Sequence, residues 1–365
     1  MSPTFSQTRW RLDDLFSSLD DSNIEAALDE TEARVTEFES LRSSLRPDLP
    51  IGDFIDCIRR LENVALLSSR VNGYADLKFA EDTGDQRAQA FVARIEEVMT
   101  GLQNRILFFE LWWKGLDESE AARLMAGAPG YRYWLEEMRR FKPHTLSEPE
   151  ERVINVKNVT GAGALVRLYD SMTNRYLFRI EEDGRQRQVT RGELMVYARH
   201  HDPDKRAAAY RELYRVYGEN GPILGQVYQT LVRDWKSEHV DLRKYPNPLS
   251  VRNLNNDIPD DVVEVLLDVC RKNAALFQRY FRIKAARLGL DRLRRYDIYA
   301  PVTISDKTYD FGQAANMVLD AFRQFDPRFS DLARRVFEEG HLDGEIRPGK
   351  RDGAFCASIL PGLTP

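Results

Sequence analysis

The sequence predicts a mainly α-helical protein: a large body of long antiparallel helices with two small extended regions. Apolar residues recur three or four positions apart over long stretches, which is the pattern of amphipathic helices. Strands and helices do not alternate, and there are no short repeats or low-complexity segments. An alternating pattern predicts a small β-hairpin near 176–190, and a short apolar run after a Gly-rich turn predicts a short strand region near 347–359. The 365-residue length fits about two domains or one large helical body.

Residues 1–141 are predicted to form an N-terminal helical region. Ser22 and Glu25 make an S-x-x-E capping box, and a helix is expected from about 23 to 41. The same apolar periodicity covers 85–111. Since short turns join these runs, we expect long antiparallel helices packed face to face.

Residues 142–346 are predicted to form a second helical region, into which the hairpin is inserted. Its first helix has Ser147 as the cap, with Glu150 reaching back to it. Further along, a single long helix is expected from about 260 to 288, with Gly289 as its C-terminal cap.

Residues 347–365 look different from the helical body. Polar and turn-forming residues give way abruptly to small apolar ones, which suits a buried strand. An exposed strand edge can hydrogen-bond an extended peptide, the recognition mode called β-augmentation. From this stretch alone an ordinary core strand is the favoured interpretation.

The composition argues against several partners. The net charge is −5, which gives no global attraction to nucleic acid or to an anionic membrane. We expect no membrane span and no signal peptide, because no uncharged apolar run has the required length. Cys57, Cys270 and Cys356 lie far apart without CxxC spacing, as expected of reduced thiols, so the expected location is the cytoplasm.

The histidines do not form a recognisable zinc motif. The H-E-x-x-H pattern places two histidines one helical turn apart with a glutamate base, and no histidine here has another four positions along. The pair Glu238-His239 is reminiscent of the inverted order H-x-x-E-H, but Trp235 stands where the first histidine is needed.

For two other candidate sites, a structural interpretation is favoured over a functional one. The first candidate consists of His200 and His201 with Asp202 and Asp204 nearby, which could form either a metal site or a solvated helix start. The helix start is favoured, because adjacent side chains on a helix point about 100° apart. The second candidate is Cys356 as a nucleophile, but the sequence places no histidine near it that could activate the thiol. The favoured interpretation of Cys356 is therefore a small buried residue. The residues alone therefore contain no complete catalytic constellation.

Six stretches in register nevertheless resemble the oligoendopeptidase F family of zinc metallopeptidases, relatives of thimet oligopeptidase. Each stretch is modest alone, and together they cover essentially the whole chain in the order of the family. The stretches are WRLDDLF (10–16), PHTLSEPEE (143–151), TGAGAL with LYD (160–165 and 168–170), RKYPNPL (243–249), LRRYDIYAP (293–301) and PGKRDGAFC (348–356).

The resemblance implies a two-lobed, mostly helical fold around a deep channel, and hydrolysis of short peptides by a zinc-activated water. In the family the Zn²⁺ ligands and the base come from H-E-x-x-H and a further glutamate, C-terminal to the stretch that matches 353–356. No zinc or catalytic residue can therefore be assigned within this chain. The resemblance does assign the substrate-edge strand, which borders the zinc site and pairs with the peptide backbone, to Gly353, Ala354, Phe355 and Cys356.

Two explanations fit the absence of the motif. The chain is either the N-terminal portion of a peptidase whose remainder carries the zinc helix, or a short relative that kept the helical lobe and lost the chemistry. We expect the first, with region 347–365 a truncated start of the catalytic region, because an exposed apolar strand edge would be an aggregation liability. The expected functions are thus a zinc oligopeptidase that is inactive as this chain alone, with the C-terminal half as partner, or a catalytically silent peptide-binding scaffold.

Overall fold

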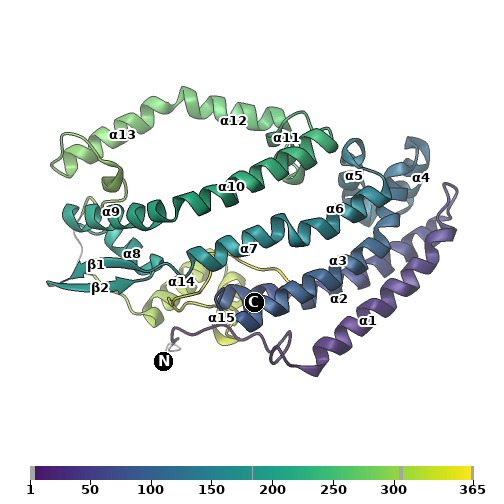
Figure 1. Cartoon of the computed structure of the whole chain (residues 1–365), viewed down its shortest axis with the longest axis horizontal. Coiled ribbons are helices and arrows are strands. Elements are labelled where there is room, and N and C mark those ends of the chain that lie inside the picture. Colours follow the sequence, from purple (N-terminus) through teal and green to yellow (C-terminus); the bar gives the residue numbers. More distant parts are fainter. Residues whose placement is uncertain (1–4, 183, 304–306, 363–365) are drawn as a thin grey trace.

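The computed structural model describes residues 5–182, 184–303 and 307–362, and it confirms a mainly α-helical fold with a small antiparallel hairpin (Figure 1). The strands are β1 (Phe178–Glu182) and β2 (Arg185–Val189), paired from Phe178 with Val189 to Glu182 with Arg185. The α-helices are α1 (Ser22–Glu39), α2 (Ile51–Glu81), α3 (Gln86–Gly115), α4 (Glu118–Gly127), α5 (Arg132–Arg140), α6 (Glu148–Thr160), α7 (Ala162–Thr173), α8 (Arg191–Ala198), α9 (Pro203–Glu219), α10 (Gly221–Trp235), α11 (Pro248–Asn255), α12 (Asp260–Lys272), α13 (Ala274–Arg287), α14 (Phe311–Phe325) and α15 (Pro327–Glu338).

The long helices lie side by side as an antiparallel array. Helix α2 packs between α1 and α3, α3 packs on α6, and α10 packs on both α7 and α9 (Figure 1). The hairpin and α8 pack against α9, and α14 packs against α15. This arrangement confirms the antiparallel packing predicted from the apolar periodicity.

Local capping explains where several helices begin. At α6, Ser147 and Glu150 form the predicted capping box. At α1 the predicted box is wrong by one residue: the side chain of Asp21 accepts the hydrogen bond from the Asn23 backbone N–H, and Ser22 is the first helical residue. A carboxylate accepts this bond as readily as a hydroxyl, and it also favours the positive helix N-terminus.

The main hydrophobic core lies among α1, α2 and α3. Its centre is aromatic: the Phe54 ring lies 5.4 Å from Trp113 and 6.4 Å from Phe109, and Phe109 lies 5.8 Å from Phe38. The indole N–H of Trp113 donates to the carbonyl of Leu135 at 3.0 Å, so the buried polar atom is satisfied. A smaller core of Phe178, Ile180, Val189, Leu194, Ala209 and Val216 lies beneath the hairpin.

The predicted single helix over 260–288 is instead two helices, α12 and α13. The break is at Asn273, whose side-chain amide donates to the Val269 carbonyl at 2.8 Å and ends the first helix. The predicted C-terminal cap is confirmed: Gly289 has φ of +69°, and the N–H of Leu290 donates to the Ala285 carbonyl at 2.9 Å. That bond, with the one from Gly289 to Ala286, forms a Schellman motif.

Helices α12 and α13 leave apolar side chains unpacked. In Figure 1 they form the outermost layer, above α9 and α10. Exposed apolar side chains on these two helices include Val265, Leu266, Phe277 and Tyr280. Such a patch exceeds what scattered surface residues produce, so it is a candidate contact surface. No helix in the described part of the chain is long and apolar enough to cross a bilayer.

Candidate functional site

The turn before the predicted substrate residues is fixed to the end of α2. The guanidinium of Arg347 donates to both carboxylate oxygens of Asp343 at 2.7 Å and to the Glu81 carbonyl at 2.8 Å. The Thr83 N–H and hydroxyl both donate to the Gly349 carbonyl, at 2.7 and 2.8 Å. Burial alone would raise the pKa of Asp343, but hydrogen bonds from Arg347 and a neighbouring lysine hold it below its ordinary value.

After this turn the chain runs antiparallel to α2. The N–H of Arg351 donates to the Ala80 carbonyl at 2.9 Å, and eight residues later Ile359 lies against Gly73. A Cβ added at Gly73 would lie 2.5 Å from the Ile359 side chain, so this close approach requires glycine. Two contacts on α2 therefore hold the ends of the segment 352–358.

The strand predicted here is not formed, and its residues are not buried. Gly353, Ala354, Phe355 and Cys356 are exposed and belong to no helix or strand; the chain bends at Gly353, whose φ is +94°, and the Phe355 ring lies edge-on to Trp10 at 6.0 Å. Among the described residues, no backbone–backbone hydrogen bond involves 353–358, and the β-bridge in this region is at Leu360, after the run. A strand needs a partner for its N–H and C=O groups, and local sequence does not supply one. The four predicted residues do lie together in one accessible run.

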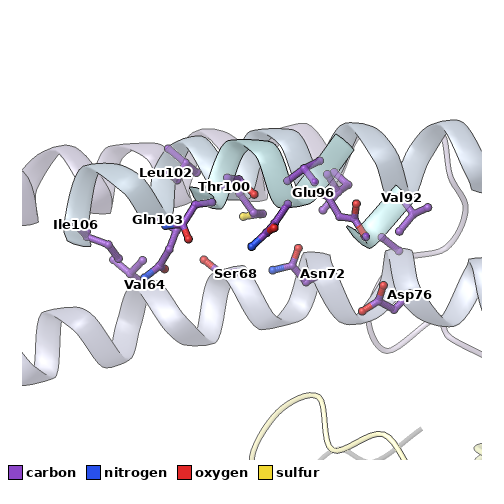
Figure 2. Close-up of a pocket in the computed structure, with 17 residues that line it drawn as sticks. Val64, Ser68, Asn72, Asp76, Val92, Glu96, Thr100, Leu102, Gln103 and Ile106 are labelled. Atoms are coloured by element: carbon purple, nitrogen blue, oxygen red, sulfur yellow. The ribbon is translucent and has the colours of Figure 1, made fainter. Parts of the chain in front are cut away.

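A cavity of about 580 Å³ lies between α2, α3 and α6 (Figure 2). Polar side chains line it from both long helices. Ser68, Asn72 and Asp76 follow one another at four-residue intervals on α2, so they share one helix face. Figure 2 shows Ser68 and Asn72 projecting toward α3, and Gln103 and Glu96 projecting back. The interior of this helix pair is thus partly polar.

The two carboxylates that line the cavity differ in whether they have a cationic partner. Glu96 is ion-paired with Arg167 of α7, and burial nonetheless raises the pKa of the Glu96 carboxyl. Asp76 has no hydrogen-bonded or ion-paired partner among the residues that the structure describes. Asp76 is solvent-exposed; partial desolvation by the surrounding helices raises the pKa of its carboxyl, while the positive charges of Arg351 and Arg167 oppose that shift.

A second polar cluster joins two of the stretches that carry the family resemblance. Arg243 forms a bidentate ion pair with Glu151 at 2.7 and 2.8 Å, and its Nε donates to Glu238 at 2.9 Å. Its carbonyl lies 2.9 Å from Nδ1 of His144, whose ring stacks 3.6 Å from that of Tyr245. Glu238 belongs to a π-helix, Lys236–Leu242. All charges of Arg243 and its carboxylates are paired, so this cluster fixes elements in place.

The other candidates have structural roles or none. Asp202 caps α9 and its N–H donates to Nδ1 of His200 at 3.0 Å, as expected of a helix start. Within the described ranges no group of three or more His, Cys, Asp or Glu side chains could hold a metal. Cys356, predicted to be a small buried residue, is exposed, because its segment lies outside the core.

The polar lining of the cavity was not singled out from the sequence, although a signal exists. In a helix whose faces are otherwise apolar or charged, Ser68, Asn72 and Asp76 repeat at helical spacing, as do Glu96, Thr100 and Gln103 on the next helix. That signal predicts two polar faces. It does not predict that α2 and α3 turn these faces toward each other, which depends on how the helices pack.

Comparisons with known proteins agree on the family. The model of the family described as Oligopeptidase F matches residues 112–178, and that of Peptidase family M3 matches 196–364. The chain is 26% identical to group B oligopeptidase PepB of Streptococcus agalactiae, over 82% of this chain and 50% of that protein. It is 22% identical to oligopeptidase PepF of Bacillus subtilis, over 96% of this chain and 53% of that protein.

Solved structures share the fold at lower identity. A putative oligoendopeptidase F from Bacillus anthracis superposes with a TM-score of 0.73 at 16% identity, covering 97% of this chain and 62% of that one. Oligoendopeptidase F from Enterococcus faecium superposes with a TM-score of 0.67 at 21% identity, covering 87% and 62%. The chain spans about half the length of the curated relatives it matches, at 50% and 53% of the first two. On the family matches, the relatives and the motifs in register, this chain belongs to the oligoendopeptidase F family of the M3 peptidases.

Proposed function

We propose that this chain forms the peptide-binding part of a zinc metalloendopeptidase that hydrolyses short oligopeptides. The observation that carries the proposal is the run 353–358, which forms no helix or strand, is exposed except at Ala357, and is anchored to α2 on both sides. Its backbone N–H and C=O groups have no hydrogen-bond partner in the described part of the chain, so an extended peptide can pair with them. Gly353, Ala354, Phe355 and Cys356 are the proposed substrate contacts.

The described residues do not fit the Zn²⁺ that the family implies, because they contain no cluster of three or more suitable ligands. We therefore place the zinc ligands on an H-E-x-x-H segment outside these 365 residues, and expect this chain alone to be inactive. The exposed apolar residues of α12 and α13 support a partner of this kind, since a further part of the family fold would cover them.

A second proposal is a catalytically silent scaffold that binds peptides along the same run. It is favoured by the same exposed backbone groups and needs no zinc. In either case the proposed location is the cytoplasm, supported by three unpaired cysteines. The proposed ligands are short peptides rather than nucleic acid or membrane, given the net charge of −5.

Replacing Cys356 by proline tests the peptide edge. Proline removes the N–H at this position, so one backbone hydrogen bond to the peptide is lost. We expect Cys356→Pro to weaken the binding of a labelled eight-residue peptide about fivefold, equivalent to about 1 kcal/mol, measured by fluorescence anisotropy.

The matched control is Cys356→Ala, which removes the thiol but keeps the N–H and is expected to bind like the wild type. Equal affinity of the proline and alanine variants would exclude backbone pairing at this position. A wild-type chain that binds no peptide would contradict both proposed functions.

A further inference from the structure

We propose that the Asp76 carboxylate binds a positively charged group, an ammonium or a guanidinium, of the peptide that lies along 353–358. The inference rests on the proposed function, because it assigns a subsite to the same peptide. It adds a specificity-determining residue on α2, at the mouth of the polar cavity, to a site otherwise formed by backbone groups.

The position of Asp76 places it beside the proposed peptide edge. Ile359 contacts α2 at Gly73, and the Arg351 N–H bonds to the carbonyl of Ala80. Asp76 lies three residues after the first contact and four before the second, so all three positions share one face of the helix. The exposed run between the two contacts therefore passes along the face that carries Asp76.

The negative charge of Asp76 is not neutralised by a direct partner. Arg167 is committed to an ion pair with Glu96, and Nε of Arg351 lies 3.5 Å from the carboxylate of Asp170. Among the described residues that line the cavity, Asp76 is therefore the carboxylate that has no bonded cation. An accessible carboxylate without a bonded cation can take a cationic ligand through charge-assisted hydrogen bonds.

The cavity beside Asp76 offers such a group further polar and apolar contacts. Ser68, Asn72 and Gln103 line it without a side-chain hydrogen bond to another described residue, and they offer both donors and acceptors. Val64 and Ile95 add apolar wall against which methylene groups can pack. A lysine or arginine side chain, or a peptide N-terminus, presents this combination of charge, polar groups and short apolar stem.

Three eight-residue peptides distinguish the sources of the charge. The first has a free amino terminus and no lysine or arginine, the second is the same peptide acetylated, and the third is acetylated with one internal lysine. Binding of each, labelled at the C-terminus, is measured by fluorescence anisotropy for the wild-type chain, Asp76→Asn and Asp56→Asn. Asp56 is the matched control, since it also lies on α2 but pairs with Arg60, away from the cavity.

We expect the wild type to bind at least one cationic peptide about tenfold more tightly than the neutral one. Whichever cationic peptide binds tightly identifies the source of the charge. Asp76→Asn should lower that affinity to the level of the neutral peptide, while Asp56→Asn should retain the preference. Because Asp76 makes no bond within the described protein, Asp76→Asn should melt no lower than the wild type, which separates lost binding from lost folding.

Equal binding of all three peptides to the wild type, or an unchanged preference in Asp76→Asn, would overturn the subsite and leave the proposed function standing. Failure of every peptide to bind would overturn both. A lower melting temperature of Asp76→Asn, with all peptides weakened equally, would show a structural role for Asp76 and also overturn the subsite.

Discussion

Cys356 is exposed although the small apolar residues around it predict a buried strand. Cys57 is the contrasting thiol: it lies in the main core at 5% exposure, and burial raises its pKa to about 11. Since the thiolate is the reactive form, about one Cys57 in a thousand is reactive at pH 8 even before access is considered.

Thiol labelling therefore reads out both environments. In the native chain at pH 8, we expect Cys270 and Cys356 to react quickly with Ellman's reagent and Cys57 to react only after denaturation. Cys57→Ala should leave the fast count at two, and Cys356→Ala should lower it to one. A native wild-type chain with one fast thiol that remains in Cys356→Ala would show that Cys356 is buried and would contradict the exposed segment.

At the scale of elements, the sequence predicts features that depend on near neighbours. The capping box of Ser147 and Glu150 and the cap at Gly289 each involve a few consecutive residues, and both are confirmed. The break at Asn273 was missed because apolar periodicity continues through it. The predicted strand failed for a different reason, since burial and pairing of 353–358 require a neighbour that local sequence does not specify. The cavity likewise depends on how α2 and α3 face each other.

The cluster around Arg243 is an element-scale contact with a large expected effect on stability. Side-chain exposures of Arg243, Glu151 and Glu238 are 14%, 11% and 14%. Burial alone would raise the pKa of Glu151, but hydrogen bonds from Arg243 and the Leu146 N–H hold it below its ordinary value. We expect Arg243→Met to lower the free energy of unfolding by about 3–5 kcal/mol, because two buried carboxylates lose their partner. Urea unfolding followed by circular dichroism measures this change.

Arg34 provides the matched control for Arg243. It lies between Glu30 and Glu37 on α1, at 3.7 and 3.2 Å, but all three side chains are about half exposed. Arg34→Met should therefore cost less than about 1 kcal/mol. Because the pKa of Glu151 is lowered in the fold, its stabilisation is present above the ordinary glutamate pKa of about 4.3 and is lost as the pH falls through the folded value. Equal costs for Arg243→Met and Arg34→Met at pH 7 would contradict the role of the buried cluster.

At the scale of the whole molecule, the surface is not uniformly polar. Helices α12 and α13 carry exposed apolar side chains, including Phe277 at 59% and Tyr280 at 55% exposure, at one edge of the helical array (Figure 1). This chain matches 50% and 53% of the length of the first two curated relatives. Both facts are explained if a further part of the family fold covers this edge and supplies the zinc ligands.

Complementation tests this explanation directly. We expect the isolated chain to bind no stoichiometric zinc by elemental analysis and to leave a quenched-fluorescence oligopeptide uncleaved. Co-expression with an M3-family polypeptide that carries H-E-x-x-H should give a stable complex whose cleavage of that peptide is abolished by a chelator. Phe277→Asp should weaken the complex, because it places a charge in the apolar contact. Ala33→Asp, on the exposed face of α1 at the opposite edge of the array, is the control and should leave it unchanged. Chelator-sensitive cleavage by the isolated chain would instead place the zinc ligands within these 365 residues, and peptide binding without any complex formation would favour the silent scaffold.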